Sequence, residues 1–350
     1  MSVKKQMQVN TFFFLSLQAL KLIMKKIIFI ILVGISLQTF SQATEASTNL
    51  QTEADKLKTE QVDSLGPWKK GGVMTLSGQQ VSLTNWAAGG QSSISANGLL
   101  SLFAIYKKGN NTWANSIDLA YGVVKQGENK NWWKNDDRIQ ATSKYGRKAF
   151  GKVYYAGLLD FRTQFAEGYN YPNDSVRISN FLAPAYALAA LGFDYKPNDN
   201  VSVFFAPATG RITIVNDQVL ANAGAFGVKK AVYALDTAGK MVMTAKGLKH
   251  REEFGGYLKL QYKRNVMENI SFQTMIELFS NYMINPQNID VNWTTLTSMK
   301  VNKYISATFS TQLLYDDDIK LVRSSGSKKG TVGPDVQFKQ ALSIGISYKF

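Results

Sequence analysis

Apolar and polar residues alternate at every second position through most of the chain beyond residue 70. The pattern is clearest in the last eleven residues, QALSIGISYKF (340–350), where apolar positions alternate with small or polar ones. Successive side chains of a strand point to opposite faces, so this spacing predicts a β-strand with one apolar and one polar face.

The same period of two recurs along the chain and predicts about twelve strands. In one example, Trp113, Ile117 and Tyr121 form an apolar face opposite Ser116 and Asp118. Most of these segments have roughly ten residues or more, the length that a tilted strand needs to cross a bilayer. The predicted strands are residues 71–84, 93–107, 113–123, 136–147, 152–165, 184–195, 201–208, 253–263, 270–282, 289–301, 305–315 and 340–350.

The connections between these strands alternate in length. Every second connection is short, and most of the intervening ones are long; the exception is 283–288. The short ones are 107–111, 146–151, 196–200, 263–269 and 300–303, and the long ones are 127–135, 166–183, 209–250 and 316–336. Short periplasmic turns and longer external loops are typical of transmembrane barrels, whereas a soluble β-sandwich has no reason to alternate in this way.

The ends of the strands support the same interpretation. Aromatic residues lie where interfacial girdles belong, and the last strand ends on Phe350, which resembles the C-terminal signature of bacterial outer-membrane barrels. Unpaired backbone groups are costly in hydrocarbon, so the sheet must close on itself. The predicted fold class is therefore all-β, a transmembrane antiparallel β-barrel of about twelve strands.

The N-terminus has the features of a secretory signal peptide. Met24 is followed by Lys25 and Lys26, an apolar run, and the small-x-small exit at residues 41–43. We interpret 1–43 as the signal peptide, with Met24 as the true start; the alternative is that 1–23 are an unusually long charged region. Residues 44–70 are polar and are either a periplasmic leader or disordered, and 71–350 form the barrel. Export and the barrel pattern together predict the bacterial outer membrane as the location.

Composition limits the chemistry and the partners. The chain has no cysteine and one histidine, His250. Its net charge of +15 falls to +10 once residues 1–43, which hold five lysines and no acid, are removed. For an exported protein this basicity points to outer-membrane lipid headgroups or small anionic solutes, and we expect no nucleic-acid partner.

Charged residues on the polar faces are the main candidates for a functional site. Asp118, Asp160, Arg162, Lys259 and Glu277 all fall near the middle of a predicted strand on its inward face. They could be neutralising pairs that fill a narrow lumen, because inward charges must be paired or solvated. Alternatively, they could form a constriction that selects solutes by charge.

Three other features have two interpretations each. The loop 209–250 is apolar enough to fold into the barrel mouth as a plug, which we favour, or to cap it as a partner surface. Asp316, Asp317 and Asp318 could bind calcium, but three adjacent acids are more typical of a solvated rim. Trp132 and Trp133 could stack on sugars or anchor the barrel in the interface.

An enzyme is not expected. The chain has no G-x-S-x-G elbow, no H-E-x-x-H motif and no phosphate-binding loop. A hydrolase would need a base beside a nucleophile, and His250 is far in sequence from any distinctive serine. We predict no catalytic residues, no cofactor and no metal.

Several long motifs resemble those of the family catalogued as domain of unknown function 3078. They are NWAAGGQSSIS (85–95), YKKGNNTWANSIDLAYG (106–122), TQFAEGYNYPNDSVRISNFLAPAY (163–186), GFDYKP (192–197), PATGRITIVNDQ (207–218) and GAFGV (224–228). The resemblance implies an exported outer-membrane protein of Bacteroidota-type bacteria. It implies no activity and no site residues.

The sequence thus favours passage or binding of a small solute through a lumen restricted by a loop. The alternative is a non-conducting barrel that docks other envelope proteins through its external loops or its periplasmic leader.

Overall fold

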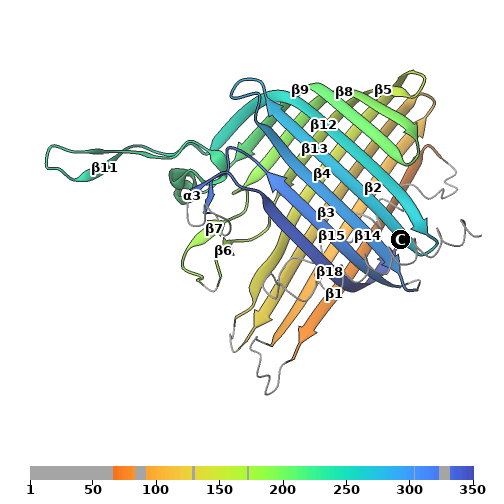
Figure 1. Ribbon diagram of the computed structural model, residues 1–350, viewed down its shortest axis with the longest axis horizontal. Helices are drawn as coiled ribbons and strands as arrows, with labels where there is room; N and C mark the ends of the chain where they lie inside the picture. The colour runs from red at the N-terminus through yellow and green to blue at the C-terminus, as the bar shows by residue number, and fades with distance from the viewer. Residues whose placement is uncertain (1–65, 83–91, 128–130, 172, 303, 323–331) are drawn as a thin grey trace, which may run out of the picture. The chain divides into compact units, whose positions relative to one another are not determined.

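The computed structural model describes residues 66–82, 92–127, 131–171, 173–302, 304–322 and 332–350. Within these residues twelve antiparallel strands form one closed barrel, in which β18 pairs back with β1 (Figure 1). This confirms the predicted fold class; the proposed signal peptide (1–43) and most of the proposed leader lie outside the described residues. The barrel strands are β1 (Trp68–Val81), β2 (Ser93–Lys108), β3 (Asn111–Gln126), β4 (Trp133–Phe150), β5 (Val153–Thr163), β8 (Ala185–Asn198), β9 (Val201–Ile214), β12 (His250–Met267), β13 (Ile270–Asn281), β14 (Ile289–Lys300), β15 (Ile305–Tyr315) and β18 (Gln337–Lys349).

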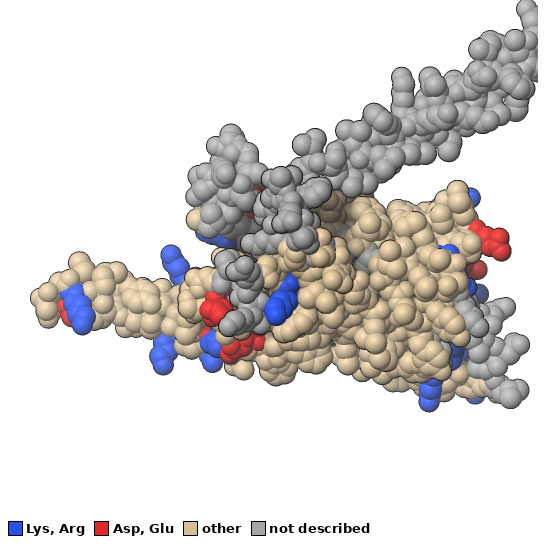
Figure 2. Space-filling view, turned by 90° about the horizontal axis from the view of Figure 1, so that it is seen from below, with Lys and Arg blue, Asp and Glu red and all other residues tan. Residues whose placement is uncertain are grey.

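The outer face of the barrel is apolar, and the inner face is mainly polar. In β18, Leu342 and Ile344 are 59% and 64% exposed, whereas Thr75 and Ser77 of the neighbouring β1 are buried inside. Figure 2 shows charged side chains gathered toward the two ends of the described barrel, with an uncharged band between them. A closed sheet with this band has the geometry of an outer-membrane barrel. Among the described residues, no helix is long and apolar enough to cross a membrane.

The seam between the first and last strands depends on glycine. The backbone groups of Gly72 and Phe350 exchange two hydrogen bonds, of 2.9 and 3.1 Å, and the Thr75 and Ser347 hydroxyls lie 2.8 Å apart inside the barrel. A Cβ atom at Gly72 would lie 2.5 Å from Cζ of Phe350. The terminal aromatic residue therefore packs over a position that only glycine can fill without displacement.

The two ends of the barrel have different connections. At the end that holds Phe350, the links 109–110, 151–152, 199–200 and 268–269 have two residues each, and 301–304 has four. The four two-residue turns are shorter than predicted because the strands continue further. At the opposite end the links run from 127–132, the shortest, to 215–249, the longest. The pattern assigns the short turns to the periplasm and the long loops to the exterior.

Aromatic side chains border the apolar band as predicted. At the periplasmic end, Trp68 lies 5.2 Å from Tyr106 and 6.0 Å from Trp113, and Tyr348 stacks on Phe350 at 6.1 Å, measured between ring centroids. At the external end, Phe254 and Tyr282 are 6.1 Å apart.

Strand β9 is longer than the predicted 201–208. It continues to Ile214 because the pairing registers with β8 and β12 both shift near Pro207. A proline has no N–H to donate and is tolerated in a sheet at a bulge. The bulge keeps the strand continuous, so Arg211 and Thr213 belong to the barrel wall rather than to a loop.

The predicted plug does not form. The loop 215–249 begins with α3 (Gln218–Ala223) and the 3-10 turn η2 (Ala225–Gly227), and continues as a hairpin of β10 (Val232–Leu235) and β11 (Met241–Ala245). All nine hairpin residues are exposed, and Figure 1 shows the hairpin projecting away from the barrel strands. The start of the loop instead packs against Ala183, in the link between β5 and β8, through Val215 and Leu220. The remaining short strands pair outside the barrel: β6 (Gly168–Tyr169) with β7 (Arg177–Ser179), and β16 (Leu321–Val322) with β17 (Val332–Gly333).

The orientation of the apolar face can be tested with two matched substitutions. We expect Leu342→Arg to lower the free energy of unfolding by about 2–4 kcal/mol, because it places a charge in the lipid. Leu235→Arg, at a hairpin residue that is similarly exposed (66%) but faces water, should change it by less than about 0.5 kcal/mol. Denaturant titration of the protein folded into lipid vesicles measures both values. Equal effects would contradict the assignment of the apolar band.

Candidate functional site in the barrel lumen

An ion pair crosses the lumen between Arg162 on β5 and Glu277 on β13. The Arg162 Nη2 atom lies 3.3 Å from Oε1 and 3.4 Å from Oε2 of Glu277, although three other strands separate β5 from β13 along the shorter path around the barrel. A contact between non-neighbouring strands must pass through the interior. The bridge therefore divides the lumen.

Both carboxylates of this site, Glu277 and Asp160, accept hydrogen bonds through both of their oxygens. Glu277 accepts hydrogen bonds from the Tyr257 hydroxyl at 2.6 Å and from Asn292 Nδ2 at 2.7 Å, and Lys259 Nζ lies 3.4 Å from Oε1. Asp160 accepts from Arg162 Nε at 2.6 Å and, through its other oxygen, from the two donors of β4 opposite it. Those two donors are Gln140 Nε2 at 3.0 Å and Thr142 Oγ1 at 2.7 Å.

Four of the five charges singled out in the sequence thus meet in one network. The exception is Asp118, which lies on β3 and accepts a hydrogen bond from Ser101 on β2. It is 1% exposed, so the position is inward as expected. It belongs to another part of the lumen wall and not to the Arg162–Glu277 bridge.

An apolar cluster fills the lumen on the shorter side of the bridge. Phe204, Tyr257 and Phe279 pack there with small residues of β5, β8 and β9, and none of the three aromatic side chains is more than 6% exposed. On the other side, inward hydroxyl and amide side chains such as Ser101, Ser298 and Thr308 are also buried. Inward residues of a water-filled bore would be exposed, so the lumen is packed around these side chains.

A second set of ion pairs lies closer to the external end. Arg211 on β9 holds Glu253 in a bidentate pair at 2.6 and 2.8 Å and reaches Asp290 on β14 at 2.6 Å. Arg251 pairs with Glu253 at 3.1 Å and with Asp318 at 2.8 Å. The sequence pattern does not indicate Arg211, because residues 209–250 are predicted as a loop. The polar face of β9 would have revealed it only if Pro207 had been recognised as a bulge.

A third set lies toward the periplasmic end. Asp194 on β8 pairs with Lys144 at 2.8 Å and Lys196 at 3.1 Å, and accepts from Ser202 Oγ at 2.8 Å. The Lys144 amine also lies 4.6 Å from the centre of the Phe204 ring, a cation–π contact with the apolar cluster.

A cavity of about 400 Å³ opens between the Arg162–Glu277 bridge and the external loops. Its floor includes Asp160, Arg162, Lys259 and Glu277. Apolar side chains line its walls, among them Leu158, Leu188, Phe279, Leu314 and Ile319. A volume of this size, apolar walls and a few converging polar groups are typical of a site for a small molecule.

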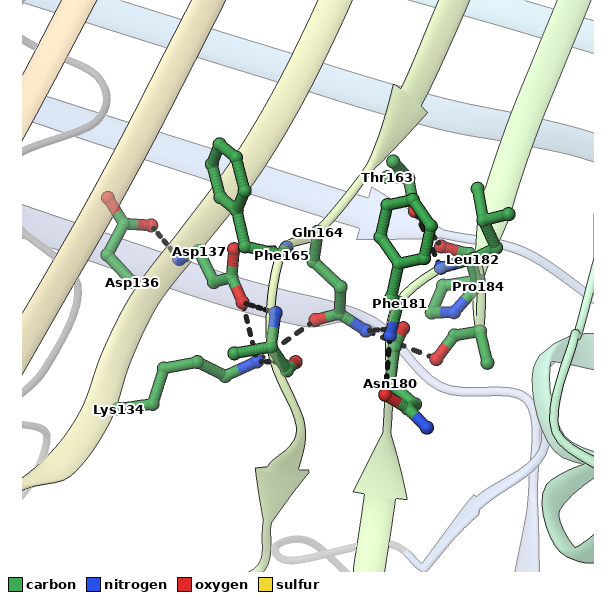
Figure 3. A network of polar contacts seen from close by, with 12 residues as sticks. Lys134, Asp136, Asp137, Thr163, Gln164, Phe165, Asn180, Phe181, Leu182 and Pro184 are labelled. Atoms are coloured by element: carbon green, nitrogen blue, oxygen red, sulfur yellow. Dashed lines mark hydrogen bonds and ion pairs between the residues drawn. The ribbon is translucent and has the colours of Figure 1, made fainter.

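The loop between β5 and β8 forms part of the rim and is held by a network of polar contacts (Figure 3). Lys134 Nζ donates to Asp137 at 2.9 Å, to Gln164 at 3.2 Å and to the Ala166 carbonyl at 2.7 Å. Asp137 in turn accepts from the backbone N–H groups of Phe165 and Ala166.

The far end of the same loop is fixed as well. The Gln164 amide donates to the carbonyls of Asn180 and Ala183, and the Thr163 hydroxyl donates to the Pro184 carbonyl and accepts from the Leu182 N–H. Thr163, Gln164 and Pro184 line the cavity, so this network fixes one side of its rim.

Helix α3 packs on this rim. Ala183 forms an apolar cluster with Val215, Leu220 and other residues of the helical segment. Asp217 caps the helix by accepting from the N–H groups of Val219 and Leu220, and pairs with Arg177 at 2.6 Å. Burial raises the pKa of Asp217, but these hydrogen bonds and Arg177 outweigh it and leave the pKa below its usual value.

The remaining candidates lie at the external surface. Arg251 contacts both Asp316 and Asp318, while Asp317 accepts from Asn288 and Tyr315. Nowhere in the described ranges do three or more His, Asp or Glu side chains come together as a possible metal site.

The predicted aromatic and histidine positions are also resolved. Trp133 stacks on Tyr171 with 5.1 Å between ring centroids, whereas Trp132 is exposed. His250 is exposed at the start of β12.

Residues 78–169 match the sequence profile of a family described as "Protein of unknown function (DUF3078)". This stretch of the chain is similar to that family. The match covers about a quarter of the sequence and confirms the resemblance that the motifs indicated. It includes β2 to β5, and therefore Asp160 and Arg162, but the family description assigns no activity. No curated protein matches the sequence.

Several solved barrels are similar at low identity. The COG4313 outer membrane channel from Pseudomonas putida F1 is 11% identical, with a TM-score of 0.38 and coverage of 83% of this chain and 98% of that one. The CymD monoaromatic hydrocarbon channel is 10% identical, with a TM-score of 0.34 and coverage of 89% and 94%. The β domain of the Bordetella autotransporter BrkA is 10% identical, with a TM-score of 0.30 and coverage of 81% and 99%. Likeness at this level does not bear on what this protein binds.

The energetic role of the bridge can be tested by removing its acid. We expect Glu277→Leu to lower the free energy of unfolding by about 3–5 kcal/mol, because it removes the carboxylate that Arg162 and Lys259 share inside the barrel and leaves Arg162 with Asp160 alone. Glu167→Leu breaks an exposed pair with Arg177 and should leave stability close to that of the wild type. Denaturant titration in lipid vesicles compares the two. Equal losses would show that Glu277 is solvated rather than buried.

Proposed function

We propose that the protein is an outer-membrane barrel that binds a small solute in the external half of its lumen and passes it inward only when the Arg162–Glu277 bridge opens. The observation that carries this proposal is the cavity of about 400 Å³ above that bridge. An external solute reaches the cavity first, and the closed network below it blocks further movement. The three sets of ion pairs are internal contacts between strands, so they can exchange partners without unfolding the barrel.

The charges also support controlled passage of a solute rather than selection of solutes by the sign of their charge. At the cavity floor, two cations (Arg162 and Lys259) face two anions (Asp160 and Glu277), so the floor carries no net charge. A constriction that sorts ions needs an excess of one sign. A neutral, cross-linked floor instead serves as a barrier that a bound solute can loosen by competing for its hydrogen bonds.

Planar-bilayer recording tests the closed state. We expect the wild-type protein to give no steady conductance, and the double variant Arg162→Ala, Glu277→Ala to give discrete openings because the bridge is removed. The double variant Glu167→Ala, Arg177→Ala is the matched control, since it removes only ion pairs outside the barrel wall, with Glu167 and with Asp217. A wild-type protein that conducts steadily, or a bridge variant that stays silent, would contradict controlled passage.

A second candidate function is the docking of another envelope protein. It is favoured by the hairpin β10–β11, which exposes Val232, Tyr233, Leu235 and Met241 to water. An isolated two-stranded hairpin is marginally stable, and its outer edges can pair with a further strand. In this role the barrel is an anchor, and the lumen need not open.

Site-specific photocrosslinking in intact cells separates the two functions. If the hairpin docks a protein, a photoreactive residue in place of Tyr233 should give a discrete protein adduct. The matched position is Tyr282, which is equally exposed (49%) at the barrel rim, and it should give none. Equal labelling at both positions, or none at either, would count against docking by the hairpin.

A further inference from the structure

The floor of the cavity has hydrogen-bond donors without acceptors. Arg162 uses Nε for Asp160 and Nη2 for Glu277, but within the described residues its Nη1 amine has no acceptor. The Tyr186 hydroxyl also has no partner among those residues. Both side chains line the cavity.

These two donors are adjacent. Arg162 on β5 and Tyr186 on β8 are directly opposite each other in the pairing register, and both point inward. Side chains at such paired positions lie close enough to act on one group. A guanidinium arm beside a phenolic hydroxyl is suited to a carboxylate, which takes charge-assisted hydrogen bonds through two oxygens.

The acids at the floor do not compete for a cationic ligand. Both oxygens of Asp160 and both of Glu277 already accept hydrogen bonds from protein donors. Further up the wall, Asp290 accepts from Arg211 through one oxygen. At the floor, the unused hydrogen-bonding capacity is therefore on the donor side, which favours a ligand that supplies acceptors.

The walls define the rest of the ligand. Leu158, Leu188 and Leu314 line the cavity around the charged floor, and Phe279 is covered on one face by the Arg211 guanidinium at 4.1 Å. An apolar body fits against these side chains and gains free energy from leaving water. A fully hydrophilic anion would leave this apolar surface in contact with water.

We infer that the cavity takes a small carboxylate with an apolar body, its carboxylate held by Arg162 and Tyr186 and its hydrocarbon part against the leucine-rich wall. This inference rests on the proposed solute-binding function and names the ligand class for it. In binding, the carboxylate contacts the Nη1 arm that Glu277 does not use, and it shares the positive charge of Arg162 with Glu277, which weakens the bridge that closes the lumen. The same contact thus recognises the solute and loosens the barrier.

Binding of three probes of equal chain length tests the inference. Hexanoate, 1-hexanol and hexylammonium are titrated calorimetrically into the full protein in lipid nanodiscs, with empty nanodiscs as the blank. We expect hexanoate to bind at least about tenfold more tightly than either of the others, because only it accepts charge-assisted hydrogen bonds.

Tyr186→Phe is the decisive variant. It removes a hydroxyl that has no hydrogen-bond partner among the described residues, so the fold has no reason to change, yet hexanoate affinity should fall by about tenfold while 1-hexanol binding stays constant. Arg162→Lys keeps the charge but loses the second arm, and should weaken hexanoate by a similar factor. Tyr262→Phe, on the apolar outer face of β12, is the matched control and should have no effect.

Each outcome decides between the two proposals. Equal affinity for hexanoate and 1-hexanol, or unchanged hexanoate affinity in Tyr186→Phe, overturns the carboxylate class while leaving a solute cavity in place. Preference for hexylammonium does the same in favour of a cation. If none of the three probes binds, the proposed solute-binding function fails together with the ligand class.

Discussion

The structure depends on pairing every backbone N–H and C=O group of the sheet while it lies in hydrocarbon. An open edge between β1 and β18 would leave a row of these groups without partners, each at a cost of several kcal/mol. The seam is closed by register pairs from Val73 with Lys349 to Ser77 with Gly345, and by the two backbone bonds between Gly72 and Phe350. The closed barrel in turn determines which side chains face the lumen and where the cavity lies.

Closing the ring creates an interior whose polar side chains must also find partners. Polar side chains are directed inward by the same alternation that directs Leu342 and Ile344 to the lipid, and most of them are removed from water. Buried charges are tolerated only when paired, which explains why Arg162, Arg211 and Lys144 each contact at least one carboxylate. The ion pairs that stabilise the interior are therefore the same contacts that close the lumen.

The cavity lies where large inward side chains no longer fill the lumen. Large aromatic side chains, such as Phe204 and Tyr257, occupy the middle of the barrel, and above them the space is bounded by leucines and by the network that fixes the β5–β8 loop. The helical segment after β9 packs on that loop, and the hairpin beyond it stays in water. Recognition of a solute in the lumen and docking of a partner on the hairpin would thus use separate parts of the molecule.

The sequence by itself determined the strands, their number, their two faces and the alternation of short and long connections, because each of these depends on residues close together in the chain. It also identified four of the charges in the bridge, since a period of two reveals which side chains point inward. It missed the second half of β9, because a proline normally ends a central strand and only the pairing on both sides shows a bulge. Only the tertiary structure decided that Arg162 meets Glu277, 115 residues away, that Asp118 does not join them, and that the long loop stays outside. Those outcomes depend on the curvature of the closed sheet and on which side chains fill the interior. Local periodicity encodes neither of them.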